Sequence, residues 1–117
     1  MIGFVGNIEN LVLENDNFRK VIFTAPHSQL VLMMLKPQEE IGMEVHEEND
    51  QFFRFEKGVG KCIINGEEHE LNNGVALLVP AGAQHNIVNT SQTDNLYFYT
   101  IYSPAHHPDG TIHHNKP

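Results

Sequence analysis

Short apolar runs separated by turn residues set the tightest limit on how this chain can fold. The runs follow one another along most of the chain, and no segment with helical periodicity of useful length interrupts them. Such a pattern is typical of an all-β sandwich or barrel. Segment 8–20 is ambiguous, and we expect a peripheral strand pair or an irregular stretch there. The predicted strands cover residues 20–25, 30–36, 42–46, 51–58, 60–66, 67–72, 75–80, 85–90 and 96–103.

Glycine, proline and asparagine mark the turns between these strands. Asn65-Gly66 predicts a tight hairpin, because both central residues can take a positive φ. Residues 72–74 and 80–82 predict two further turns, and residues 58–60 predict a bend. Because no repeat or linker interrupts the series, we expect one compact β domain.

The charge of the chain argues against some classes of partner. Of its 117 residues, 15 are acidic and 7 are Lys or Arg, which gives a net charge of −8. Nucleic acids and anionic membrane surfaces require clustered Lys and Arg, so neither is expected as the main partner. No apolar stretch reaches bilayer length, and the first residues lack the basic start and apolar run of a signal peptide. Cys62 is the single cysteine, which favours a cytoplasmic protein with a reduced, packed and inert thiol.

Five residues near the end of the strand series stand at a fixed spacing. They are Gly74, Pro80, Gly82, His85 and Asn89. The glycines and the proline stand where strands must turn. The whole set resembles the second motif of the cupin superfamily, in which the histidine is a metal ligand. Taken alone, His85 could instead be a buried histidine bonded to a backbone carbonyl.

Residues 41–58 resemble the first cupin motif, with two departures from it. Gly58 fixes the register, because the family places a glutamate seven residues before this glycine and a histidine five residues before the glutamate. The alternative register, with Glu48 as the second ligand, leaves too short a spacing to the next one. The resemblance therefore implies metal ligands at Glu44, His46, Gln51 and His85, where the family usually has His, His, Glu and His.

The implied fold is a double-stranded β-helix, the cupin or jelly-roll barrel. It implies a single cupin domain over residues 1–117, with the barrel core at about 20–103 and a C-terminal tail at 104–117. Side chains alternate along a strand, so Glu44 and His46 should share one face. By the same rule, we expect Gln51, Phe53 and Phe55 to point inward and Phe52, Arg54 and Glu56 to point outward.

The implied cofactor is one divalent metal ion in the mouth of the barrel. Glutamate, imidazole and amide donors favour Fe, Mn, Ni or Zn over copper, which prefers softer ligands. Gln51 is a weaker donor than a carboxylate, and it could instead face a bound water or the substrate. The tail carries His106 and His107, and it is either a flexible exposed end or a lid that brings one of them to the site.

Two classes of function follow from this site. The first is a metal-dependent enzyme, an oxygenase or an isomerase/lyase, that acts on a small neutral or metal-chelating organic molecule. The second is a non-catalytic module that binds a small ligand or a metal. A sugar-phosphate isomerase is less favoured, because Arg19 and Arg54 are the only arginines and Arg54 falls on the outward face. We also expect a homodimer, since Ile2, Phe4 and Val5 have little of their own to pack against.

Overall fold

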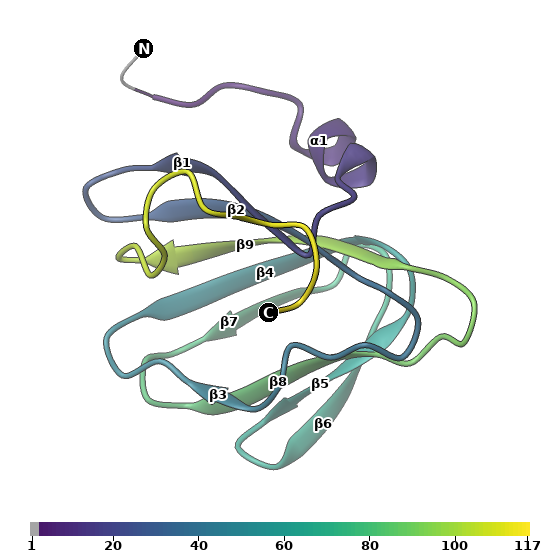
Figure 1. Ribbon diagram of the computed structural model, residues 1–117. Helices are drawn as coiled ribbons and strands as arrows, with labels where there is room; N and C mark the ends of the chain where they lie inside the picture. The colour runs from purple at the N-terminus through teal and green to yellow at the C-terminus, as the bar shows by residue number, and fades with distance from the viewer. Residues whose placement is uncertain (1–2) are drawn as a thin grey trace.

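Two antiparallel sheets lie face to face in the computed structural model, which describes residues 3–117 (Figure 1). The larger sheet has the strand order β10-β1-β2-β9-β4-β7, and the smaller has the order β3-β8-β5-β6. The architecture is all-β and consistent with the predicted double-stranded β-helix. The elements are α1 (Ile8–Glu14), β1 (Arg19–Thr24), β2 (Gln29–Leu35), β3 (Glu44–Val45), β4 (Asp50–Lys57), β5 (Gly60–Ile64), β6 (Glu67–Leu71), β7 (Ala76–Val79), β8 (Gln84–Asn89), β9 (Leu96–Ser103) and β10 (Ile112–His113).

The predicted strands and turns are confirmed, with small shifts at their ends. β9 has the predicted bounds, whereas β3 keeps only two of its predicted residues. Between β5 and β6, Asn65 and Gly66 have φ values of 48° and 83°, which is the tight hairpin that the Asn-Gly pair predicts. Gly58 has a φ of 107°, and a Cβ there would lie 2.6 Å from the Asn95 carbonyl oxygen, so only glycine fits this bend.

The interpretation of segment 8–20 as strands or an irregular stretch is wrong for its first part, which forms helix α1. Asn7 caps the helix, because its Oδ1 accepts a hydrogen bond from the Asn10 N–H at 3.0 Å. Val12 is fully buried and packs the short helix against the larger sheet. A helix of 7 residues is too short to show clear periodicity, and its stability depends on this packing.

The C-terminal tail lies against the barrel. β10 pairs with β1, with His113 opposite Arg19. Gln29, which is buried in β2, accepts hydrogen bonds from the His106 and His107 N–H groups at 3.1 and 3.0 Å and donates to the His107 carbonyl at 2.7 Å. Of the two alternatives for the tail, the structure therefore supports the one in which it folds over the barrel.

The core fills the space between the two sheets. Gln51, Phe53 and Phe55 are all buried and Arg54 is exposed, as the predicted alternation along β4 requires, while Phe52 and Glu56 are only half-buried. Cys62 is fully buried, and its burial raises the pKa of the thiol, in keeping with an inert side chain. Across residues 3–117, no helix has the length and apolar character needed to span a membrane.

Candidate metal centre

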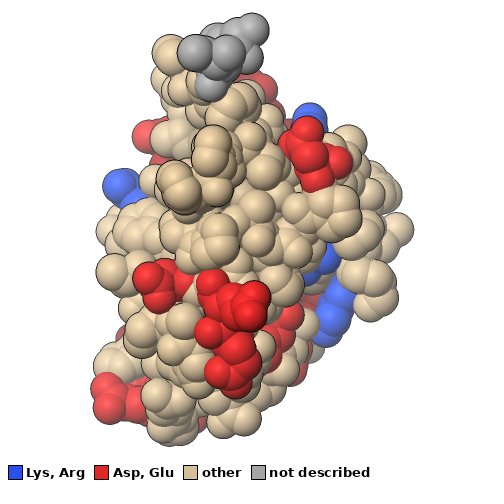
Figure 2. Space-filling model, turned by 90° about the vertical axis from the view of Figure 1, so that its left-hand side faces the viewer, with Lys and Arg blue, Asp and Glu red and all other residues tan. Residues whose placement is uncertain are grey.

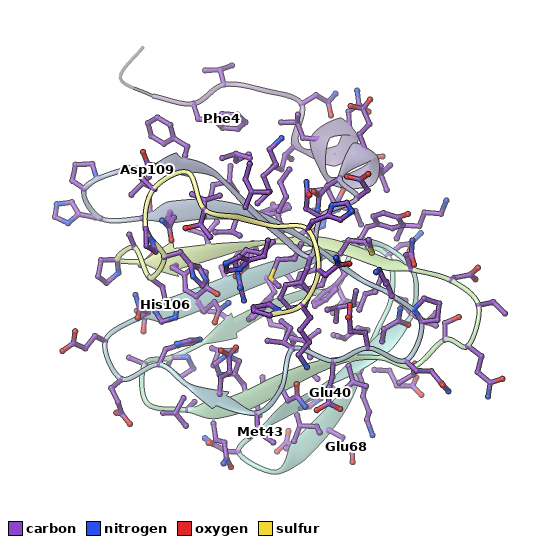
Figure 3. All side chains as sticks on the ribbon, in the orientation of Figure 1. Phe4, Glu40, Met43, Glu68, His106 and Asp109 are labelled. Atoms are coloured by element: carbon purple, nitrogen blue, oxygen red, sulfur yellow. The ribbon has the colours of Figure 1, made fainter. Side chains whose placement is uncertain are left out.

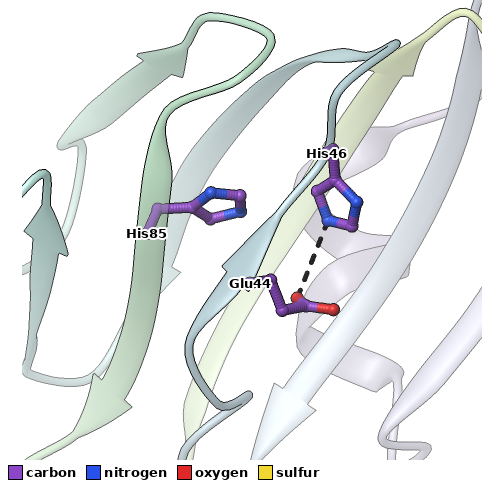
Figure 4. Close-up of side chains that lie close together, drawn as sticks. All are labelled: Glu44, His46 and His85. Carbon is purple, nitrogen blue, oxygen red and sulfur yellow. Dashed lines mark ion pairs between the residues drawn. The ribbon is translucent and has the colours of Figure 1, made fainter.

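The structure brings the four predicted ligand residues together at one end of the barrel. Glu44 lies opposite His85 in the pairing of β3 with β8, and His46 follows β3. One ligand atom from each of Glu44, His46 and His85 lies within 4.8 Å of the others, so the three could hold a metal ion (Figure 4). Gln51 approaches them from β4, with its Oε1 3.2 Å from the His85 Nε2.

His85 is held in one tautomer by the backbone. Its Nδ1 lies 3.1 Å from the Ala83 carbonyl oxygen, which can only accept, so Nδ1 carries the proton. Burial lowers the pKa of His85, which keeps the imidazole neutral. The Nε2 lone pair is therefore directed into the site, as in a metal-binding histidine whose other nitrogen donates to a carbonyl.

Gln51 directs its carbonyl oxygen at the same point. Its Nε2 donates to the Thr100 Oγ1 at 2.9 Å, which leaves the Oε1 facing the His85 Nε2. In the neutral tautomer described above, both facing atoms are acceptors and no proton lies between them. A cation would relieve this contact by binding to both lone pairs.

His46 contributes a buried nitrogen that has no partner. The residue is 8% exposed, and its Nε2 makes no hydrogen bond within residues 3–117. The nearest charged atom is the Glu44 Oε1 at 3.7 Å, which is too far for a hydrogen bond. Since buried polar atoms in proteins are nearly always paired, the donor set fits a metal ion at this nitrogen.

Glu44 is ionised in this setting. Burial acts to raise its pKa, but the contact with His46 and the electrostatic influence of His46, His85 and Arg19 outweigh burial. The pKa of the carboxyl group therefore lies below its ordinary value. An ionised carboxylate beside two imidazoles is a set of hard and intermediate donors suited to a divalent first-row metal.

The second motif holds this arrangement through its backbone. The Gly82 N–H donates to the His46 carbonyl at 2.9 Å, which ties the turn before β8 to the segment after β3. Asn89 has no contact with the site. Its Nδ2 donates to the carbonyl groups of Leu35, Lys36 and Asp94, so its role is to fix loops at the opposite end of β8.

His106 and Tyr102 complete the wall of the site. The His106 ring lies 4.3 Å from that of His46 and stacks on Tyr102 at 5.1 Å between centroids. Figure 3 shows His106 on the tail at the end of the barrel where β9 ends. Burial lowers the pKa of His106 and raises that of Tyr102, so both are neutral at pH 7. The sequence offered His106 only as one alternative for the tail.

Arg19 is an interior residue that the sequence analysis left out of the site. It is 8% exposed, its Nη1 lies 2.8 Å from the His113 Nδ1, and its guanidinium lies over the Phe18 ring. Arg54, in contrast, is on the outer face and pairs with Glu56 at 3.1 Å. The predicted outward position of Arg54 is confirmed, whereas the sequence predicted no position for Arg19, which is buried. The preference against a sugar phosphate stays a prediction.

The outer rim near the ligands is acidic. Glu47, Glu48 and Asp50 lie next to His46 in the chain and are all exposed. Figure 2 displays the face of the molecule that lies on the left in Figure 1, and acidic side chains gather on its lower part with few basic ones around them. A surface of this charge attracts cations and repels multiply charged anions.

The chain resembles two proteins in sequence and one solved structure in fold. The chain is 46% identical over 117 residues to an uncharacterized protein of Acanthamoeba polyphaga mimivirus, with 97% of this chain and 73% of that protein covered. It is 40% identical over 119 residues to the uncharacterized protein YrkC of Bacillus subtilis, of which it spans 63%. A crystal structure of a Bacillus halodurans protein superposes with a TM-score of 0.94 at 39% identity, covering 97% of this chain and 89% of that one.

A family model identifies the fold directly. The model described as a cupin domain, Cupin_2, matches residues 31–102, which include all four of the proposed ligand residues and both sequence motifs. The match extends from β2 to β9, and so covers the strands that carry these ligands. The chain therefore belongs to the cupin family.

Proposed function

We propose that this cupin binds one divalent first-row metal ion through Glu44, His46, Gln51 and His85. The observation that carries the proposal is the buried His46 Nε2, which has no hydrogen-bond partner within residues 3–117. The facing lone pairs of Gln51 and His85 support the same site from the other side. Fe, Mn, Ni or Zn suits these donors.

We further propose that the site acts on a small, metal-chelating organic molecule, as an oxygenase or an isomerase/lyase. When bound, the metal would supply Lewis acidity, or oxygen activation in the case of iron. Tyr102 remains a phenol, because its buried hydroxyl resists ionisation, and it can donate a hydrogen bond to a substrate oxygen. The neutral His106 can accept a proton at the mouth of the site.

The non-catalytic binding module remains the alternative from a different class. It needs the same metal ligands but no group that moves a proton. Substitution of His106 by Asn separates the two, since turnover of a chelating substrate would fall while its binding would persist. Binding without turnover in the parent protein would favour the module.

The first experiment measures metal content by mass spectrometry on untagged protein purified without chelator. We expect about one equivalent per chain in the parent and little in a His46→Ala/His85→Ala double variant, because two of four donors are removed. His69→Ala is the matched control, since His69 lies on β6 with its side chain 52% exposed. Absence of metal from the parent after reconstitution with each of the four metals would contradict the proposal.

A further inference from the structure

Arg19 is a buried charge that forms no direct ion pair. No Asp or Glu within residues 3–117 forms an ion pair with it, although it is only 8% exposed. Burying an unpaired charge costs several kcal/mol as a rule, so an uncompensated guanidinium requires an explanation. The ring of Phe18, 5.1 Å from the guanidinium carbon, supplies only part of the missing stabilisation.

The hydrogen bonds of Arg19 leave one edge of the guanidinium free. Its Nη1 donates to the His113 Nδ1, but its buried Nε has no partner within the described part of the chain. The Nε–H and an Nη2–H are parallel and form the fork that binds both oxygens of a carboxylate. Anchoring the tail through His113 explains the Nη1 contact and leaves this fork unexplained.

A second buried atom without a partner lies on the tail that covers Arg19. It is the Nε2 of His107, whose pKa is lowered to about 4 by burial first and by the charge of Arg19 next. His107 is therefore neutral. The two unpartnered atoms, the Arg19 Nε and the His107 Nε2, come from different segments, β1 and the tail. One local error in packing therefore does not explain why both lack a hydrogen bond.

A continuous row of rings joins this region to the metal centre. The His107 ring lies 4.7 Å from that of His106 and 5.3 Å from Tyr102, and the His106 ring lies 4.3 Å from that of His46. Through these ring contacts, the segment around Arg19 and the metal ligands belong to one connected region of the interior.

We propose that the Nε and Nη2 edge of Arg19 binds the carboxylate of a small organic acid whose other donor atoms face Glu44, His46 and His85. This inference rests on the proposed function only for the donor atoms that face the metal ligands. Binding of the carboxylate to Arg19 does not depend on a metal. One guanidinium matches one negative charge, and the acidic rim repels multiply charged anions. A carboxylate therefore fits better than a phosphate dianion.

The test compares three probes by NMR titration, with the protein both metal-loaded and stripped with chelator. Glycolate carries a carboxylate and a chelating hydroxyl, glycolamide is its neutral counterpart, and inorganic phosphate is the competing anion. We expect glycolate to bind the parent and Arg54→Met equally and to bind Arg19→Met at least tenfold more weakly. Glycolamide and phosphate should bind the parent more weakly than glycolate does.

Thermal melting of the same variants separates ligand binding from a structural role. Without ligand, Arg19→Met should melt no lower than the parent, because it removes an unpaired buried charge. Glycolate should raise the melting temperature of the parent and leave that of Arg19→Met unchanged. A large drop in melting without ligand, together with unchanged glycolate affinity, would overturn the inference.

Arg19→Lys keeps the test decisive if Arg19→Met does not fold. Lysine keeps the charge but loses the fork, so glycolate should bind several-fold more weakly. Unchanged binding to this variant, equal binding of glycolamide, or tighter binding of phosphate would each overturn the inference. Metal content is measured on the same samples. Glycolate binding that depends on Arg19 in a protein that takes up no metal would support the inference and contradict the proposed function.

Discussion

Gln51 puts a neutral amide where the cupin motif usually has a carboxylate. Glu44 is the only formal anion among the four proposed ligands, so the donor set carries the same charge as the usual one, with the carboxylate at position 44 instead of 51. Metal affinity at a site of oxygen and nitrogen donors increases with the charge of the ligands. A glutamate at position 51 would add a second carboxylate beside Glu44 and should therefore strengthen metal binding.

Restoring the carboxylate tests this prediction. Gln51→Glu should increase the affinity for Mn or Zn by about tenfold or more, since about 1.4 kcal/mol corresponds to a factor of ten. The measurement is competition with a metallochromic chelator at fixed pH. Gln51→Leu, which removes the donor, is the matched control and should bind more weakly than the parent. Equal affinity in all three proteins would mean that residue 51 does not face the metal.

At the scale of single residues, sequence spacing predicted which candidate ligand residues lie close together in the structure. The glycines of the two motifs fixed the register, and the structure brings together Glu44, His46 and His85. Arg19 could not be placed in the same way, because its partner His113 lies 94 residues further along the chain. A contact of that separation depends on how the tail folds, and no local pattern encodes it.

Among the elements, the tail depends on one side chain of β2. Gln29 is 1% exposed, and its amide hydrogen-bonds to Thr24, to the N–H groups of His106 and His107, and to the His107 carbonyl. The tail is thereby held over the barrel at the point where it carries His106 to the metal centre. Gln29 therefore joins the stability of the tail to the geometry of the site.

We expect Gln29→Ala to lower the free energy of unfolding by about 2–4 kcal/mol, because it leaves buried backbone groups of the tail unpaired. Urea denaturation measures the loss. Hydrogen exchange of the amides at residues 106 and 107 should rise more than that of β9. Gln92→Ala, at an exposed loop position, should change neither quantity. Unchanged exchange at the tail in Gln29→Ala would contradict this role.

Most strands were predictable, whereas helix α1 and strand β10 were not. Alternation and Asn-Gly turns are local signals, so β4, β5, β6 and β9 could be predicted from neighbouring residues alone. Helix α1 and strand β10 form because the barrel offers them a surface, through Val12 in one case and the edge of β1 in the other. Tertiary packing of this kind is absent from any short window of sequence.

For the whole molecule, the homodimer stays a prediction. Val5 is 89% exposed, which leaves an apolar side chain without a partner in the described chain; Ile2, named with it above, lies outside the described residues. Light scattering should give twice the 13.3 kDa chain mass, and Val5→Asp should shift the protein toward the single-chain mass. Val59→Asp is the control, because Val59 is also an exposed apolar residue, with 50% of its surface accessible. A single-chain mass for the parent would contradict the dimer.

The cytoplasmic location and the division into core barrel and tail also stay predictions.

The position of β9 has a consequence for biosynthesis. β9 lies between β2 and β4 in the larger sheet, yet β3 to β8 separate it from β2 along the chain. As the ribosome releases the chain in order, β2 and β4 each keep an open hydrogen-bonding edge until β9 emerges. Open edges of apolar strands invite pairing with other chains. Both edges therefore stay open until β9 has been synthesised, and a complete site exists only after translation has passed β9 and the tail.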